Sequence, residues 1–162
     1  MGPRYIAVVG GSEATEAQQA DAEAVGRALA EGGAILVCGG RGGVMEAACR
    51  GAKAGGGTTV GILPGADRAE ANPWVDVALP TGLGEARNVL VVRAADALVA
   101  VGGGFGTLSE IALALRLGKP VVGLGTWDLS SPGPDRVVRV DSPGQAAAEA
   151  LRLAAAPAPP AS

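Results

Sequence analysis

Residues 101–110 read Val-Gly-Gly-Gly-Phe-Gly-Thr-Leu-Ser-Glu, and they join a predicted strand to a predicted helix. The apolar run before them, residues 97–101, is typical of a buried strand, and residues 108–117 have the apolar content of a packed helix. At such a junction the unpaired N–H groups of the first helical turn and the helix dipole favour an anion. Glycine also lets a phosphate approach without meeting a Cβ atom. The stretch therefore predicts a site for a phosphorylated ligand such as a nucleotide.

An earlier segment repeats this pattern: residues 37–46 read Val-Cys-Gly-Gly-Arg-Gly-Gly-Val-Met-Glu. The valine, three glycines and the glutamate recur at the same spacing, and both segments open a predicted helix after a predicted strand. Chance similarity between tight turns is the alternative, but the repeated glutamate favours a real correspondence. Because parallel strands end at one edge of a sheet, we expect both turns to face a shared crevice.

Apolar runs alternate with helical stretches along the whole chain, which is the pattern of βαβ units. This predicts an α/β fold, a Rossmann-like doubly wound parallel sheet with helices on both faces. We expect one nucleotide-binding domain over residues 1–154 and a disordered Ala/Pro tail over residues 155–162. The predicted strands are residues 5–9, 34–38, 58–63, 75–79, 97–101, 120–124 and 137–140. The predicted helices are residues 16–31, 43–54, 83–94, 108–117 and 145–154.

Composition excludes several functions for this chain of 162 residues. A net charge of −3, no cluster of Lys and Arg, and 2% aromatic residues argue against a nucleic-acid partner. No apolar stretch is long enough to span a membrane, so we expect no membrane partner. The sequence has no histidine, which excludes zinc-type metal sites and His-dependent triads. With Cys38 in a predicted buried strand, we expect a reduced, cytoplasmic protein without a bound metal.

The glycine turns supply the predicted donors to the phosphate. The first strand is not followed by a Gly-x-Gly-x-x-Gly motif, and the chain has no P-loop motif, so a mononucleotide or another monophosphate fits better than a dinucleotide. The candidate phosphate- and nucleotide-binding residues are Gly11, Ser12, Gly40, Arg41, Gly103, Gly104, Phe105, Gly106 and Thr107.

Glu110 is the first candidate catalytic residue. It lies beside the predicted phosphate cradle, where a like charge is unfavourable unless the carboxylate serves the ligand further along. A carboxylate near a ribose C1′ can stabilise an oxocarbenium-like transition state or activate water. The alternative is structural, because residues 107–110 also match a capping box in which Glu110 bonds back to the N-cap amide.

Arg87 is the second candidate. Residues 89–92, Val-Leu-Val-Val, follow it and predict a helix buried on every side, so the guanidinium needs a partner. It could clamp a phosphate or a leaving base, for which a planar guanidinium is well suited. An ion pair with Glu85 or Glu110 is the structural alternative.

Several of these segments together resemble the Lonely Guy family of cytokinin-activating nucleoside 5′-monophosphate phosphoribohydrolases, once labelled lysine decarboxylases. Residues 102–110 look like its Pro-Gly-Gly-x-Gly-Thr-x-x-Glu motif, and residues 84–88 look like its Met-His-x-Arg-Lys segment, whose catalytic arginine falls on Arg87. Residues 10–12 and 39–45 resemble its other glycine-rich loops. The resemblance covers residues 5 to about 124 and implies hydrolysis of an N-glycosidic bond that releases base and ribose 5-phosphate.

The chain also departs from these motifs. Histidine is absent, Asn88 replaces the lysine, and Gly102 replaces the proline. Residues 71–76 and 82–88 look instead like the molybdenum cofactor carrier-like branch, whose members bind a phosphorylated pterin without necessarily turning it over. The sequence favours an enzyme that cleaves the N-glycosidic bond of a nucleoside 5′-monophosphate, with no cofactor required. The alternative is a carrier that binds the molybdenum cofactor without turning it over.

The predicted helix over residues 108–117 has more apolar surface than one sheet can cover. Leu108, Ile111 and Leu115 share one face, while Leu113 and Leu117 point elsewhere. Pairing with a second copy would bury that excess, so we expect a homodimer or a higher homo-oligomer, as the family resemblance also implies. The alternative is that the C-terminal helix covers these faces within one chain.

Overall fold

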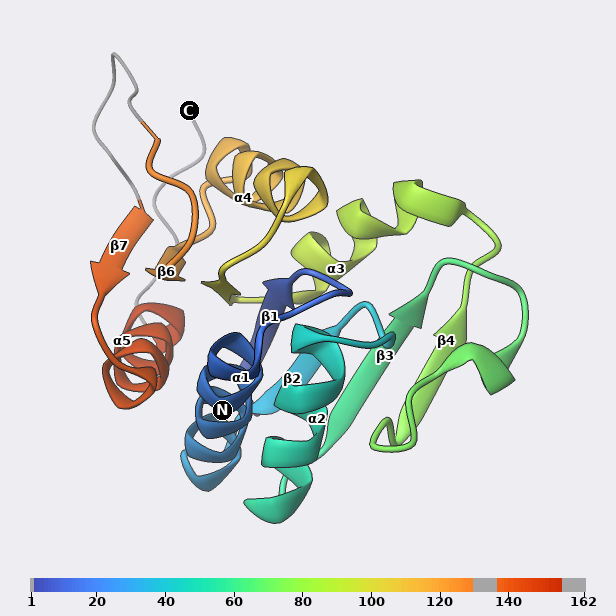
Figure 1. The fold of residues 1–162 in the computed structure, drawn as a ribbon, viewed down its shortest axis with the longest axis horizontal. Coiled ribbons are helices and arrows are strands. Elements are labelled where there is room, and N and C mark those ends of the chain that lie inside the picture. Colours follow the sequence, from blue (N-terminus) through green and yellow to red (C-terminus); the bar gives the residue numbers. More distant parts are fainter. Residues whose placement is uncertain (1, 130–136, 156–162) are drawn as a thin grey trace.

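The computed structural model describes residues 2–129 and 137–155, in which seven parallel strands form one sheet between two layers of helices (Figure 1). The strands are β1 (Tyr5–Gly10), β2 (Ile35–Cys38), β3 (Thr59–Leu63), β4 (Val77–Pro80), β5 (Ala97–Val101), β6 (Val121–Leu124) and β7 (Val137–Val140). Their order across the sheet is β4-β3-β2-β1-β5-β6-β7. The predicted doubly wound, Rossmann-like fold is confirmed.

Helices cover both faces of this sheet. The α-helices are α1 (Glu16–Glu31), α2 (Val44–Ala54), α3 (Asn88–Ala94), α4 (Phe105–Arg116) and α5 (Pro143–Ala155), and the 3₁₀ helices are η1 (Arg68–Glu70) and η2 (Gly84–Arg87). α1, α2 and α5 pack on one face, and α3 and α4 on the other. Across the described residues no helix is both long and apolar enough to cross a membrane.

The central strands are apolar on both sides because each face of the sheet carries a core. All five residues of β5 are fully buried. Val99 packs with α1, α2 and α5, while Leu98 and Ala100 pack with α3 and α4. Successive side chains of a strand point to opposite faces of the sheet, and both faces are buried here. This is why residues 97–101 are apolar without interruption.

The chain reverses direction across the sheet between β1 and β5. From β1 it proceeds through β2 and β3 to β4 at one edge, and then returns to β5 on the other side of β1. The two strands are in register up to their ends, where Gly10 pairs with Val101. Their connections leave in opposite directions, which opens a crevice at the carboxyl ends, the usual ligand site of such sheets.

The start of α4 differs from the prediction. The helix begins at Phe105 rather than after Gly106, with Gly104 as an N-cap that makes no side-chain hydrogen bond. Thr107 is therefore already inside the helix, so the structural alternative, a capping box between Thr107 and Glu110, is wrong. Gly102 and Gly103 have positive φ angles and turn the chain directly from β5 into the helix.

Three smaller differences concern the other helices. The predicted helix over residues 83–94 is divided into η2 and α3, and Leu90 of α3 is 39% exposed although burial on every side was predicted. α5 packs on the same face of the sheet as α1, opposite α3 and α4. The alternative to oligomerisation, in which the C-terminal helix covers the apolar surface of α3 and α4, is therefore wrong. Ala155 ends α5, while the rest of the predicted tail, residues 156–162, lies outside the described residues.

Candidate functional site

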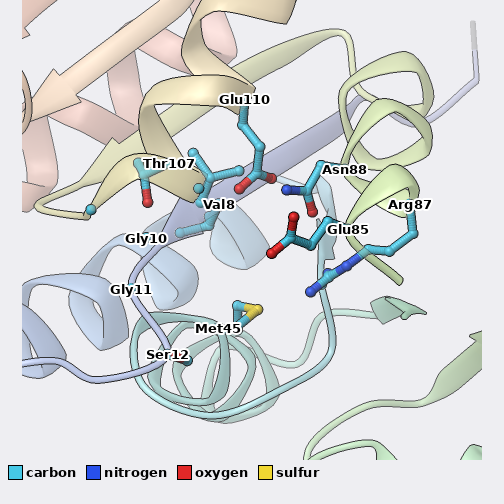
Figure 2. Close-up of a pocket in the computed structure, with 14 residues that line it drawn as sticks. Val8, Gly10, Gly11, Ser12, Met45, Glu85, Arg87, Asn88, Thr107 and Glu110 are labelled. Atoms are coloured by element: carbon cyan, nitrogen blue, oxygen red, sulfur yellow. The ribbon is translucent and has the colours of Figure 1, made fainter. Parts of the chain in front are cut away.

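A cavity of about 350 Å³ opens at the carboxyl ends of β1, β2 and β5, where the glycine turns meet (Figure 2). The turns after all three strands contribute to it, including the turns after β2 and β5, which the two repeated sequence segments predicted to share a crevice. The cavity is lined by Val8, Val9, Gly10, Gly11, Ser12, Gly39, Met45, Glu85, Arg87, Asn88, Gly104, Gly106, Thr107 and Glu110.

The first turn of α4 forms one wall of this cavity and has the properties of an anion site. No side chain caps the helix, so its first N–H groups have no intrahelical partner. The space in front of Gly104 and Gly106 is open, since a Cβ atom at either position would meet nothing within 4 Å. Thr107, a residue that is only 3% exposed, adds a hydroxyl to the cavity lining. This wall can bind a phosphate through backbone N–H groups and the helix dipole.

Glu110 lies one turn further along α4, with its side chain directed into the cavity. The residue is only 9% exposed. Burial raises the pKa of its carboxyl group to about 7, and the nearby positive charge of Arg87 lowers it only in part. A carboxyl group with this pKa can be either protonated or charged near neutral pH, which is the requirement for a general acid or base.

Replacing Glu110 with Gln should stabilise the fold at alkaline pH. Between pH 4.5 and about 7 the folded chain keeps a proton that the unfolded chain has released. The wild-type unfolding free energy therefore falls as the pH rises through this window, by about 3 kcal/mol in total. Glu110→Gln should recover most of this difference at about pH 8 and little at about pH 4. Urea denaturation at both pH values measures it.

Glu13→Gln is the matched control, because Glu13 is an exposed carboxylate on the turn after β1. It should leave the pH dependence unchanged. A Glu110→Gln variant no more stable than the wild type at alkaline pH would contradict the buried, destabilised carboxylate.

Arg87 reaches the cavity from the junction of η2 and α3. Its Nη1 donates a hydrogen bond to the carbonyl oxygen of Ile62 (3.2 Å), and its buried Nε has no hydrogen-bond partner in the described part of the chain. The guanidinium occupies the space beside Gly39, where a Cβ atom would lie 1.7 Å from Nη1. Burial lowers the pKa of Arg87, and the charge of Glu110 opposes this. Arg87 forms no ion pair with Glu85 or Glu110, so that alternative is wrong.

Glu85 and Asn88 also line the cavity, although neither was predicted as a ligand contact. Both belong to the segment, residues 84–88, that was singled out for Arg87. The turn of η2 followed by the first residue of α3 brings all three side chains to the same space (Figure 2). Met45 and Gly39 were likewise not selected individually. Their place in the repeated glycine segment was the signal that could have identified them.

Four predicted binding residues lie outside the cavity lining: Gly40, Arg41, Gly103 and Phe105. Arg41 forms an ion pair with Glu70 of η1 (Nη1–Oε2 3.1 Å). Phe105 is 81% exposed and its ring lies 5.6 Å from that of Trp127. Their contacts with a ligand stay predictions, as do those of the predicted residues that do line the cavity.

Cys38 and Cys49 lie behind the β2 turn. Both thiols are buried and free, with their Sγ atoms 3.5 Å apart, and the amide of Gly40 donates a hydrogen bond to Cys38 Sγ (3.3 Å). The predicted burial of Cys38 is confirmed. Within residues 2–129 and 137–155, no group of three His, Cys, Asp or Glu residues is arranged to hold a metal ion.

Sequence comparison relates this chain to a known family. The sequence model of the SLOG cluster4 family matches residues 3–147, which is nearly the whole described chain. The chain belongs to the SLOG cluster4 family. This confirms the expected place in the superfamily of Lonely Guy and molybdenum cofactor carrier-like proteins. An uncharacterized protein of Archaeoglobus fulgidus is 48% identical over 119 residues, which are 74% of this chain and 78% of that protein.

Two solved structures superpose on nearly the full length of the present chain. The molybdenum cofactor binding protein of Rippkaea orientalis superposes with a TM-score of 0.84 and 36% identity, covering 94% of this chain and 97% of that one. The molybdenum cofactor carrier protein of Chlamydomonas reinhardtii gives a TM-score of 0.85 and 38% identity, covering 96% of this chain and 100% of that one.

Proposed function

We propose that the chain binds a phosphorylated pterin, with the molybdenum cofactor as its ligand, and acts as a carrier. The observation that carries this proposal is the uncapped N-terminus of α4, which opens into a cavity of about 350 Å³ with Arg87 on another wall. This volume is within the range of small-molecule sites, roughly 300–1,000 Å³. The likeness over nearly the full length to two proteins described as binding or carrying the molybdenum cofactor supports the same ligand here.

The lining residues suit a ligand with one anionic and one ring-shaped part. The phosphate would accept hydrogen bonds from the first turn of α4 and from Thr107, and Arg87 would supply positive charge. A negatively charged carboxylate close to the phosphate would weaken binding. Glu110, however, has a pKa of about 7, so it can remain protonated and uncharged when the phosphate is bound. Protonated Glu110 removes the repulsion and can donate a hydrogen bond to the ligand.

A phosphoribohydrolase is the second candidate, because Glu110 with its raised pKa and Arg87 line the same cavity. In this reaction the C1′–N bond of a nucleoside 5′-monophosphate breaks and the base keeps the electron pair. Water adds to C1′, one of its protons goes to the base, and ribose 5-phosphate leaves. Ionised Glu110 would take that proton from water or stabilise the positive charge at C1′, and Arg87 would hold the phosphate or the departing base.

One experiment separates the two candidates. The purified protein is incubated with the molybdenum cofactor, passed through a sizing column, and assayed for molybdenum and pterin in the protein fraction. A parallel set of incubations with nucleoside 5′-monophosphates is assayed for ribose 5-phosphate. The carrier proposal expects stoichiometric molybdenum and pterin without ribose 5-phosphate. Repeated turnover of a nucleotide, with no retained molybdenum, would overturn it in favour of the enzyme.

We also propose that the chain forms a homodimer through α3 and α4. Leu90 of α3 is 39% exposed, and Leu108 and Leu113 of α4 are only partly buried. Light scattering should give about twice the chain mass of 15.7 kDa for the wild type. Leu90→Glu should lower this to the mass of one chain, because a charge would have to be desolvated in the interface.

Ala20→Glu is the control for this dimer. Ala20 is exposed on α1, which covers the opposite face of the sheet from α3 and α4. It should leave the dimer intact. A wild-type mass of one chain would contradict the proposal directly.

A further inference from the structure

We propose that Glu85 and Asn88 recognise the 2-amino-4-oxopyrimidine edge that pterin and guanine share, so that the site selects this ring over adenine or hypoxanthine. The inference rests on the proposed function, in that it requires a phosphorylated ring compound in the cavity. It assigns ring selectivity to two residues that take no part in binding the phosphate.

Both side chains are free to contact a ligand. Glu85 and Asn88 line the cavity and point into it (Figure 2). Neither side chain makes a hydrogen bond or an ion pair with another described residue, as the contacts of residues 2–129 and 137–155 show. Arg87, which lies between them in the sequence, donates a hydrogen bond from Nη1 to the carbonyl of Ile62 and forms no ion pair with Glu85.

The buried groups beside them indicate that this region is built for a ligand. Glu110 is only 9% exposed and makes no hydrogen bond within the described chain, although its carboxyl group reaches the cavity. The Nε of Arg87 is buried without a partner. Buried polar groups in folded proteins are normally hydrogen-bonded, so the unpartnered Nε of Arg87, beside the largely buried carboxyl group of Glu110, supports a ligand at this cavity.

Glu85 and Asn88 lie on a different wall of the cavity from the groups that would bind the phosphate, so they can contact the ring of the ligand. The phosphate-binding wall consists of the first turn of α4 and the turn after β1. Glu85 and Asn88 come instead from η2 and the start of α3. A ligand with its phosphate on α4 can therefore direct its ring toward the two polar side chains.

The chemistry of the two side chains selects one kind of ring edge. A carboxylate only accepts hydrogen bonds, and it can accept two at once from a ring N–H and the adjacent exocyclic amine. Pterin and guanine present this pair of donors beside a ring carbonyl, to which the Asn88 amide can donate. Hypoxanthine lacks the amine. Adenine presents a ring nitrogen lone pair in place of the N–H, which would face the carboxylate of Glu85 unfavourably.

Calorimetric titration with four phosphates tests the inference. GMP and IMP differ only by the 2-amino group, AMP has the wrong edge, and ribose 5-phosphate has no ring. We expect GMP to bind about tenfold more tightly than IMP, the difference made by about one hydrogen bond to a charged group. AMP should bind more weakly than IMP, and a pterin monophosphate should compete with GMP. Ribose 5-phosphate, assayed in the same samples, reports any turnover.

Glu85→Gln is the deciding variant, with Glu13→Gln as its control. A Gln side chain offers one acceptor and one donor, so the preference for GMP over IMP should disappear while ribose 5-phosphate binds as before. Glu13→Gln should keep the wild-type preference. Equal affinities of the wild type for GMP, IMP and AMP, or a preference that survives Glu85→Gln, would overturn the inference but leave phosphate binding intact. If none of these phosphates binds, both the inference and the proposed function are wrong.

Discussion

Gly26→Val is expected to lower the unfolding free energy by at least about 3 kcal/mol, because the new side chain would occupy the backbone of the neighbouring helix. A Cβ atom at Gly26 of α1 would lie 2.0 Å from the carbonyl oxygen of Ala48 in α2. No side-chain rotation relieves this clash, since the atom that it meets belongs to the main chain. The two helices would have to separate, and the apolar residues packed between them would lose contacts.

The same close approach is visible from the other helix. A Cβ atom at Gly51 of α2 would lie 1.9 Å from the carbonyl oxygen of Glu23 in α1. The helices therefore touch along their backbones at two points, one glycine from each side. This packing holds the loops that precede both helices, which contain the turns after β1 and β2. Destabilising it should also disorder one side of the cavity.

Urea denaturation of Gly26→Val beside Ala20→Val tests this prediction. Ala20 is an exposed position of the same helix, so the control carries the same β-branched side chain without the clash. It should cost no more than the difference in helix propensity, about 0.6 kcal/mol. Equal stability of the two variants would show that the helices can separate at little cost in free energy, which would contradict a tight backbone contact between α1 and α2 at Gly26.

Arg87→Met is expected to weaken binding of phosphorylated ligands by about 100-fold, which corresponds to about 3 kcal/mol for charge-assisted hydrogen bonds in a partly buried site. Among the lining residues of the cavity, Arg87 is the one that carries a permanent positive charge. Methionine keeps much of the length and apolar volume of the side chain and removes the charge. Calorimetry with GMP or a pterin monophosphate measures the loss.

Arg27→Met is the matched control for this effect. Arg27 lies on α1, its guanidinium is bound to Glu31, and it is not among the residues that line the cavity. Its replacement should change ligand affinity by no more than about twofold. Circular dichroism of both variants verifies that they fold. An Arg87→Met variant that binds the ligand as tightly as Arg27→Met would contradict a role of Arg87 in binding.

The order and type of the elements could be predicted from the sequence because they depend on neighbours within a few residues. The fully apolar run of residues 97–101 predicted a doubly buried strand, and β5 has those bounds. The helix over residues 16–31 was predicted with its observed bounds, and in the structure Thr15 forms a capping box with Gln18 at its start. The glycine turns were correctly predicted to face one crevice, since all strands of the sheet are parallel.

The start of α4 could not be predicted from local pattern alone. Residues 107–110 match a capping box, yet the helix begins two residues before Thr107. The preceding turn is held by residues that follow β6. Thr126 donates a hydrogen bond to the carbonyl of Gly102 (2.6 Å), and the indole of Trp127 donates one to the carbonyl of Gly104 (3.0 Å). These contacts join parts of the chain more than twenty residues apart, and no local pattern contains them.

By itself, the sequence determined the alternation of strands and helices, the two glycine turns and the presence of a carboxylate after the second turn. Only the tertiary structure decided which side chains share the cavity and in what state. Arg87 enters because Gly39 leaves space and Ile62 offers a carbonyl, whereas Arg41 is bound by Glu70. The pKa of Glu110 is raised because several elements together remove water from it. Burial and electrostatic fields are sums over residues distant in sequence, so they exist only once the chain has folded.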